Sequence, residues 1–153
     1  MSPGEFRQRN GGIERRFTGA ERRMIGRLAD GVVTALADDP DSAVTRRLLP
    51  NAYPDDAEAS KEFADAVRDR LAEAKTEGAQ RLTDDLQAAP NGLLHLDEQG
   101  AVVWLKALGD LRLALAERIG LDEVMRDVRT PQGLIYAWLT WLQGSLVEAL
   151  DPD

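Results

Sequence analysis

The apolar segment at residues 98–119 constrains the fold of this chain more than any other feature. Asp97 before it is a typical N-cap residue and Gly120 after it is a typical C-terminal residue, so the segment predicts one helix. Its apolar residues leave almost no polar face: Val102, Val103, Trp104, Leu105, Leu108, Leu111, Leu113, Leu115 and Ile119. Because a helix that is apolar on most sides is buried, we expect the other elements to pack around it.

Four further helices are indicated by apolar residues at three- and four-residue spacing. We expect them at residues 19–37, 42–48, 55–86 and 131–150. Thr18 and Glu21 have the spacing of a capping box, and Thr130 followed by Pro131 is a helix start signal. In the longest helix, the apolar positions from Phe63 to Leu86 predict a face that packs on the core.

The N-terminal residues 5–17 predict a β-hairpin, because Asn10-Gly11 supplies the positive φ angles that a tight turn requires. Residues Leu93–Leu96 are too few for a helix and suit a third strand. An isolated hairpin is marginal in water, so the ribbon must lie on helices. We expect a mainly α (α+β) fold, in which about five helices surround the central apolar helix beside a small antiparallel hairpin or three-stranded sheet. A chain of 153 residues fits one such domain, residues 1–153.

The composition excludes several kinds of chemistry. The chain has no cysteine, which excludes disulfides, thiolate nucleophiles and cysteine metal sites within it. His95 is the single histidine, and the sequence contains neither a nucleophile elbow nor a Gly-rich phosphate loop. Paired acidic residues stand at turns and exposed helix positions, where they fit a solvated surface. We therefore expect no enzyme, no metal site and no cofactor.

The expected location is the cytoplasm. No apolar run approaches the ~20 residues that a membrane-spanning helix needs. The first residues, Met1 to Arg9, lack the apolar stretch of a signal peptide. These two observations predict a cytoplasmic protein without a membrane contact.

Arg112 falls on the apolar stripe of the central helix. Burying an unpaired charge is costly, so we expect Arg112 to pair with a carboxylate on the 55–86 helix, with Glu62 as first choice. A structural ion pair that fixes the register of the two helices is favoured over a ligand-binding arginine. The aromatic residues expected in the core are Trp104, Trp138 and Trp141.

Positive charge is concentrated at the N-terminus. Residues 1–27 hold seven arginines and three glutamates, whereas the whole chain has a net charge of −8. Six arginines are candidates for contact with a partner or nucleic acid: Arg7, Arg9, Arg15, Arg16, Arg22 and Arg23. Two observations argue against DNA binding. No set of aromatic residues for base stacking accompanies these arginines, and the net negative charge of the chain repels a polyanion.

Three groups of residues, in this order, match the pattern of a known family. They are Arg47-Leu48-Leu49-Pro50-Asn51-Ala52-Tyr53 with Glu62-Phe63, Trp104-Leu105 with Asp110-Leu111-Arg112-Leu113-Ala114-Leu115, and Tyr136-Ala137-Trp138-Leu139 with Leu142-Gln143 and Leu146. The chain resembles an actinobacterial family of unknown function that includes AosR-like oxidative-stress transcriptional regulators. The resemblance covers nearly the whole chain, although Gly109 stands where the family pattern has Asn.

The resemblance implies regulation through a protein partner in transcription, such as a sigma factor, with a redox-responsive disulfide in some members. That disulfide is impossible here. We expect a non-enzymatic regulatory or adaptor protein that binds a protein of the transcription or stress-response machinery. A homodimer is a further option, because it would cover excess apolar helix faces. The alternatives are a nucleic-acid-binding regulator that uses the N-terminal arginines, and a small-molecule sensor with its ligand near Trp104 and Trp138.

Overall fold

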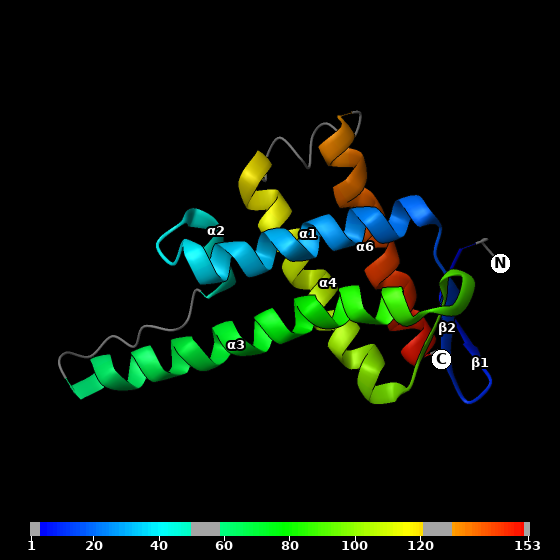
Figure 1. The fold of residues 1–153 in the computed structure, drawn as a ribbon, viewed down its shortest axis with the longest axis horizontal. Coiled ribbons are helices and arrows are strands. Elements are labelled where there is room, and N and C mark those ends of the chain that lie inside the picture. Colours follow the sequence, from blue (N-terminus) through cyan, green and yellow to red (C-terminus); the bar gives the residue numbers. More distant parts are fainter. Residues whose placement is uncertain (1–3, 50–58, 121–129, 152–153) are drawn as a thin grey trace.

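The computed structural model describes residues 4–49, 59–120 and 130–151 (Figure 1). In chain order the elements are β1 (Arg7–Arg9), β2 (Gly12–Arg16), α1 (Gly19–Asp38), α2 (Ala43–Leu48), α3 (Ala59–Ala88), a 3₁₀ turn (Pro90–Gly92), β3 (Leu93–Leu96), α4 (Glu98–Ile119) and α6 (Pro131–Leu150). The predicted mainly α fold with a small antiparallel sheet is confirmed. The bounds of β3, α4 and α6 match the sequence prediction.

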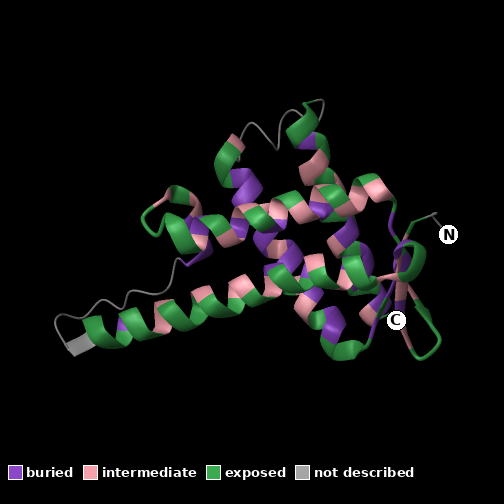
Figure 2. Ribbon diagram, viewed as in Figure 1, coloured by how far each residue is buried: buried purple, intermediate pink, exposed green. Residues whose placement is uncertain are grey.

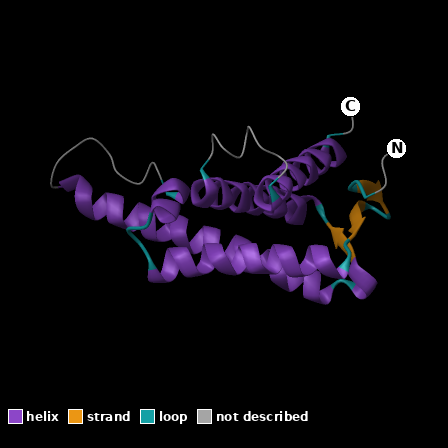
Figure 3. Ribbon diagram, turned by 90° about the horizontal axis from the view of Figure 1, so that it is seen from above, coloured by secondary structure: helices purple, strands orange, loops and turns teal. Residues whose placement is uncertain are grey.

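The helices form two layers that cross. Figure 1 shows α1 and α3 running antiparallel in one layer and α4 and α6 running antiparallel in the other. The short α2 packs on α4, and the sheet lies at one end of the helical body (Figure 3). This arrangement leaves α4 in contact with α1, α2, α3 and α6, as its apolar sequence predicts.

The core surrounds α4. Trp104 and Leu108 of α4 are fully buried, as are Leu139 and Leu142 of α6, and Figure 2 shows buried residues concentrated where the two layers cross. The ring of Phe17 packs against that of Trp104 with 5.8 Å between ring centres, so the sheet end joins the same core. One continuous apolar cluster therefore holds both layers and the sheet.

The hairpin forms at the predicted turn. Asn10 and Gly11 have φ angles of 54° and 77°, which a two-residue hairpin turn requires. Strand β2 lies between β1 and β3, and Ile13 pairs with Leu96 in the antiparallel β2–β3 register. The Phe17 N–H donates to the Gly92 carbonyl at 2.8 Å, which fastens the end of β2 to the turn before β3.

Arg15 lies on the buried face of β2. Strand alternation puts it beside Ile13 and Phe17, and its exposed fraction is only 5%. Its guanidinium donates two hydrogen bonds to the Glu21 carboxylate of α1, both at 3.2 Å, and a third to the Gly4 carbonyl. The same group lies over the rings of three aromatic residues, Phe17, Trp138 and Trp141, at 4.4, 5.7 and 5.9 Å. This one side chain thus links the sheet, α1 and α6.

The N-terminal half of α3 departs from the predicted core face. Phe63 is 68% exposed and Leu71 is 37% exposed, and Figure 2 shows this half extending beyond the other helices. Ala79, Leu82 and Leu86 are buried in the second half of the helix, whereas the small Ala64 is the buried residue described in the first half. With 30 residues, α3 is about 45 Å long, so its N-terminal half extends beyond the helices that pack on it. Apolar periodicity predicts a face and does not fix how much of that face is covered.

Replacing Gly92 with Ala should lower the free energy of unfolding by at least about 2 kcal/mol, measured by urea denaturation. Gly92 has a φ angle of +80°, and a Cβ there would collide with the Phe17 carbonyl oxygen. Gly144→Ala is the control, because a Cβ at that helical position meets nothing within 4 Å. Equal effects at the two positions would contradict the role given to Gly92.

Replacing Glu21 with Gln should lower the free energy of unfolding by about 1–2 kcal/mol at pH 7. Burial alone would raise the pKa of Glu21, but the hydrogen bonds from Arg15 and Thr18 outweigh it and lower this pKa. The stabilisation is therefore present above the ordinary value of 4.5 and is lost as the pH falls through the lowered pKa. Urea denaturation of both proteins from pH 7 to pH 3 tests this, and a difference that grows in acid would refute it.

Candidate functional site

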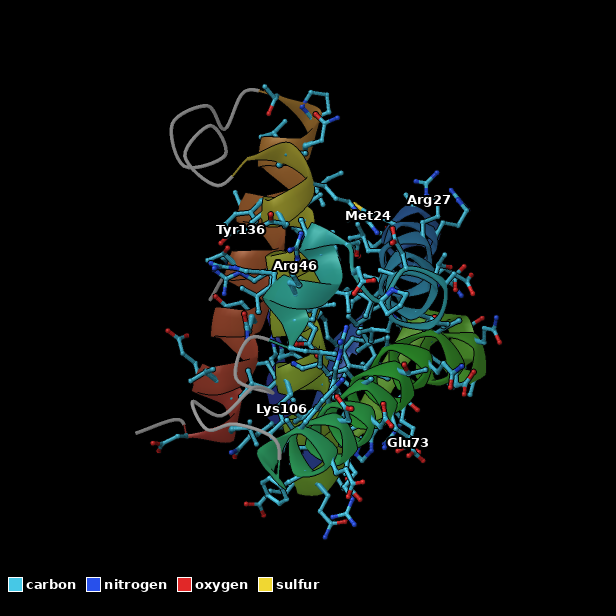
Figure 4. All side chains as sticks on the ribbon, turned by 90° about the vertical axis from the view of Figure 1, so that its left-hand side faces the viewer. Met24, Arg27, Arg46, Glu73, Lys106 and Tyr136 are labelled. Carbon is cyan, nitrogen blue, oxygen red and sulfur yellow. The ribbon has the colours of Figure 1, made fainter. Side chains whose placement is uncertain are left out.

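A groove opens between α3, α4 and α6, with a cavity of about 810 Å³. Most of its lining is apolar, with Leu71 and Ala74 from α3 facing Leu105 and Leu113 from α4. In Figure 4 the labelled Lys106 and Tyr136 lie on the side of the molecule away from Arg27, and both line this groove. A cavity of this size and character suits a small ligand or the apolar side chains of a partner.

An ion pair joins two walls of the groove. Lys75 Nζ of α3 lies 2.7 Å from Asp110 Oδ1 of α4, and the two side chains are 24% and 12% exposed. Burial raises the pKa of Asp110 above its ordinary value, although the hydrogen bond and charge of Lys75 oppose that rise. The desolvation of this carboxylate therefore outweighs the attraction of its partner.

A chain of hydrogen bonds joins α4 to α6, the third wall of the groove. Arg112 of α4 donates to Gln143 Oε1 at 2.7 Å and to the Tyr136 hydroxyl at 3.3 Å, both on α6. Gln143 Nε2 donates in turn to the Leu105 carbonyl at 3.0 Å. A Cβ at Gly109 would lie 3.2 Å from Gln143 Nε2, so this glycine gives the amide room to approach α4. Position 109, where the family resemblance led us to expect Asn, lies at this contact.

The expected pair of Arg112 with Glu62 is wrong. Arg112 bonds to Gln143 and Tyr136, and Glu62 is exposed in the first turn of α3. Glu62 precedes Lys75 by thirteen residues, which places it about 20 Å along the helix from the crossing with α4. The long helix and the central helix are joined by an ion pair, but its acid is Asp110 and its base is Lys75.

The six candidate arginines do not form one surface. Arg15 is buried, and Arg16 donates to the Asn91 carbonyl at 2.7 Å. Arg7 and Arg9 lie on the hairpin strand β1, whereas Arg22 and Arg23 lie in the first turns of α1. Strand alternation could have identified Arg15 as a core residue, because it shares a face with Ile13 and Phe17.

The three tryptophans occupy different environments. Trp104 is fully buried and donates its indole N–H to Asp85 Oδ2 at 2.8 Å. Trp138 is partly buried, and Trp141 is 39% exposed, so the assignment of Trp141 to the core is wrong. The Trp141 ring lies at the edge of the core, with its centre 5.9 Å from the guanidinium carbon of Arg15. No tryptophan lines the groove, so a ligand bound there would not touch Trp104 or Trp138.

Other kinds of site find no support in the part of the chain that the structure describes. Among the described residues, no group of three or more His, Asp or Glu is placed to hold a metal ion. His95 is exposed on β3. None of the described helices is long and apolar enough to cross a membrane.

The described residues form a mainly helical fold with an open groove between α3, α4 and α6. The chain belongs to the DUF2017 family, a domain of unknown function whose model matches residues 1–150. It is 35% identical over 140 residues to the putative oxidative stress regulator AosR of Mycobacterium leprae, and 33% identical over 144 residues to the oxidative stress regulator AosR of Mycobacterium tuberculosis.

These alignments cover 78% of this chain but only 64% and 63% of the two relatives. The chain thus spans just under two thirds of the length of the curated relatives that it matches. No solved structure matches the chain.

Replacing Asp110 with Asn should raise the melting temperature at pH 7 slightly, because the substitution removes a carboxylate that is costly to bury, and Lys75 still reaches water. The pKa of Asp110 is raised in the folded state, so its own contribution to stability improves as the pH falls through that raised pKa towards 3.8. The advantage of the variant should therefore shrink in acid. Thermal unfolding from pH 7 to pH 3.5 tests this, and a variant that melts lower at pH 7 would contradict it.

Proposed function

We propose that the chain is a regulatory protein of the oxidative-stress response that acts by binding a protein partner in the groove between α3, α4 and α6. Its mycobacterial relatives are named oxidative stress regulators. In this role the chain catalyses no reaction, and its partner belongs to transcription or the stress response.

The observation that carries this proposal is the exposed apolar surface of the groove. Leu71 of α3 and Leu113 of α4 line the same cavity, and they remain 37% and 36% exposed. Apolar side chains gathered in a groove are typical of sites that another molecule covers. An amphipathic helix of a partner fits such a groove, because three helices form its walls.

The charges around the groove favour an acidic partner helix. The charge of Asp110 is balanced by Lys75, so Glu77 is the remaining acidic residue among the described lining of the groove. The lining also carries three positively charged residues, Arg81, Lys106 and Arg112. Of these, Arg81 forms an ion pair with Asp85 at 2.8 Å. The groove is therefore locally cationic in a chain whose net charge is −8. Carboxylates beside the apolar residues of the partner would complement it.

The signal that controls such binding differs from a thiol switch in this chain. With no cysteine, the chain cannot form a disulfide of its own when the cell is oxidised. The oxidative signal that controls binding in the groove is therefore sensed by the partner or is carried by another ligand.

The double substitution Leu71→Asn with Leu113→Asn should abolish regulation of oxidant-induced transcripts in the native host. The control is Leu134→Asn with Val147→Asn, which removes two apolar side chains that are 57% and 48% exposed on α6 outside the groove. Because all four positions are exposed, each substitution should cost the fold no more than about 1 kcal/mol.

The measurement combines transcript levels after oxidant treatment with photocrosslinking from position 113 and from position 147. The proposal expects a crosslinked partner from position 113 and lost regulation in the groove variant at normal protein abundance. Normal regulation by the groove variant, or crosslinking from position 147 alone, would show that the partner binds elsewhere.

A further inference from the structure

Helix α6 presents an uncovered apolar face. Figure 4 shows α6, in orange and red, at the edge of the helical body, on the far side of α4 from α1. Leu134, Trp141 and Val147 are exposed on it. Of its 20 residues only Glu148 is charged, whereas at the 30% of charged residues in the whole chain such a helix would carry about six. A surface helix with so little charge and such large exposed apolar residues is typical of one that another chain covers.

One stripe along α6 has the spacing of a seam between two helices. From the N-cap onward its members are separated by four and three residues in turn, which keeps them on one face of the helix, as at the a and d positions of a coiled coil. All six are exposed, and none is among the described lining of the groove: Thr130, Leu134, Ala137, Trp141, Gly144 and Glu148. We call this stripe the α6 seam.

The α6 seam is complementary in shape to itself. When two copies of α6 pair antiparallel with Ala137 opposite Trp141, the stripe maps onto itself and Leu134 lies opposite Gly144. A Cβ at Gly144 would meet nothing within 4 Å in the described structure, so the position is an open notch. Each large apolar side chain thus meets a small residue, which lets two helices pack closely. A shift of the pairing by four residues would instead set Trp141 against its own copy, and a shift by three the other way would set Leu134 against Trp141.

Charge favours the same pairing. Glu148 lies near the C-terminal end of α6, where the helix dipole already places partial negative charge, and it forms no ion pair with a described residue. In the antiparallel pair Glu148 lies beside Thr130, the N-cap of α6 in the second copy, where the dipole places partial positive charge. The pairing therefore stabilises the one charge of this face and brings no like charges of the two helices together.

We propose that the α6 seam binds a second copy of this chain and forms a two-fold symmetric, antiparallel dimer. A two-fold contact uses the same patch on both copies, and the self-complementary shape and charge of the seam meet that requirement. A face about 30 Å long is small for a dimer interface, so the association is reversible. Since the seam residues lie outside the described lining of the groove, this dimer and the proposed binding of a partner can be tested separately.

The test exchanges the large and the small residue of one contact. Gly144→Leu fills the notch that Leu134 of the second copy occupies, and the open space at position 144 lets each copy fold normally. This change should weaken dimerisation at least about tenfold, because overpacking a close contact is destabilising. Addition of Leu134→Ala restores a small residue opposite the new leucine and should recover affinity. The matched control is Gly26→Leu on α1, where a Cβ likewise meets nothing within 4 Å, and it should dimerise as the wild type does.

Sedimentation velocity from about 1 μM to 1 mM measures the dimer over the range in which a small interface dissociates. The wild type should become dimeric as its concentration rises. A wild type that stays monomeric throughout, or an exchanged pair that dimerises no more tightly than Gly144→Leu alone, would overturn the proposal. An equal loss of affinity in Gly26→Leu would overturn it as well, because that glycine lies outside the seam.

The absence of cysteine from the chain permits a second test, of the register. Leu134→Cys with Gly144→Cys places two thiols about 15 Å apart along one helix, too far for a disulfide within one copy. Oxidation should link two copies covalently, because position 134 lies opposite position 144 of the second copy. The control, Leu134→Cys with Val147→Cys, places its second thiol outside the seam and should link far less. A dimer that links through the control pair and not through the seam pair would refute the antiparallel seam.

Discussion

The burial of one cation, Arg15, determines how the parts of this domain meet. Its guanidinium bonds to Glu21 at the start of α1 and to the Gly4 carbonyl, and it lies between the ring of Phe17 and the two tryptophans of α6. A buried charge of this kind is tolerated only when its donors and its ring contacts are all in place. The sheet, the first helix and the last helix therefore assemble around it as one unit.

Much of the secondary structure could be predicted because local chemistry determines it. Thr18 and Glu21 form the capping box, Thr130 caps α6, and Asn10 adopts the positive φ angle of the hairpin turn. These signals act within a few residues, so a sequence contains them in full. The all-round apolar character of α4 likewise predicted its central place.

The partners of side chains on different helices could not be predicted in the same way. Apolar periodicity places Arg112 on a face of α4, but the point at which α3 crosses α4 depends on the packing of every helix. That crossing brings Lys75 to Asp110 and leaves Glu62 far from it. The groove follows from the same crossing, so neither it nor the exposure of Phe63 had a signal in the sequence.

Helix α3 borders two cavities, the groove beside α4 and α6 and a second cavity of about 560 Å³ beside α1. Thr83 and Leu86 border the cavity on the α1 side, and Leu71 and Lys75 border the groove on the other side of the same rigid rod. Both borders belong to one continuous helix of about 45 Å, so a shift of α3 changes the walls of both cavities together. The Lys75–Asp110 pair fastens α3 to α4, and the half of α3 that carries the exposed Phe63 extends beyond the other helices.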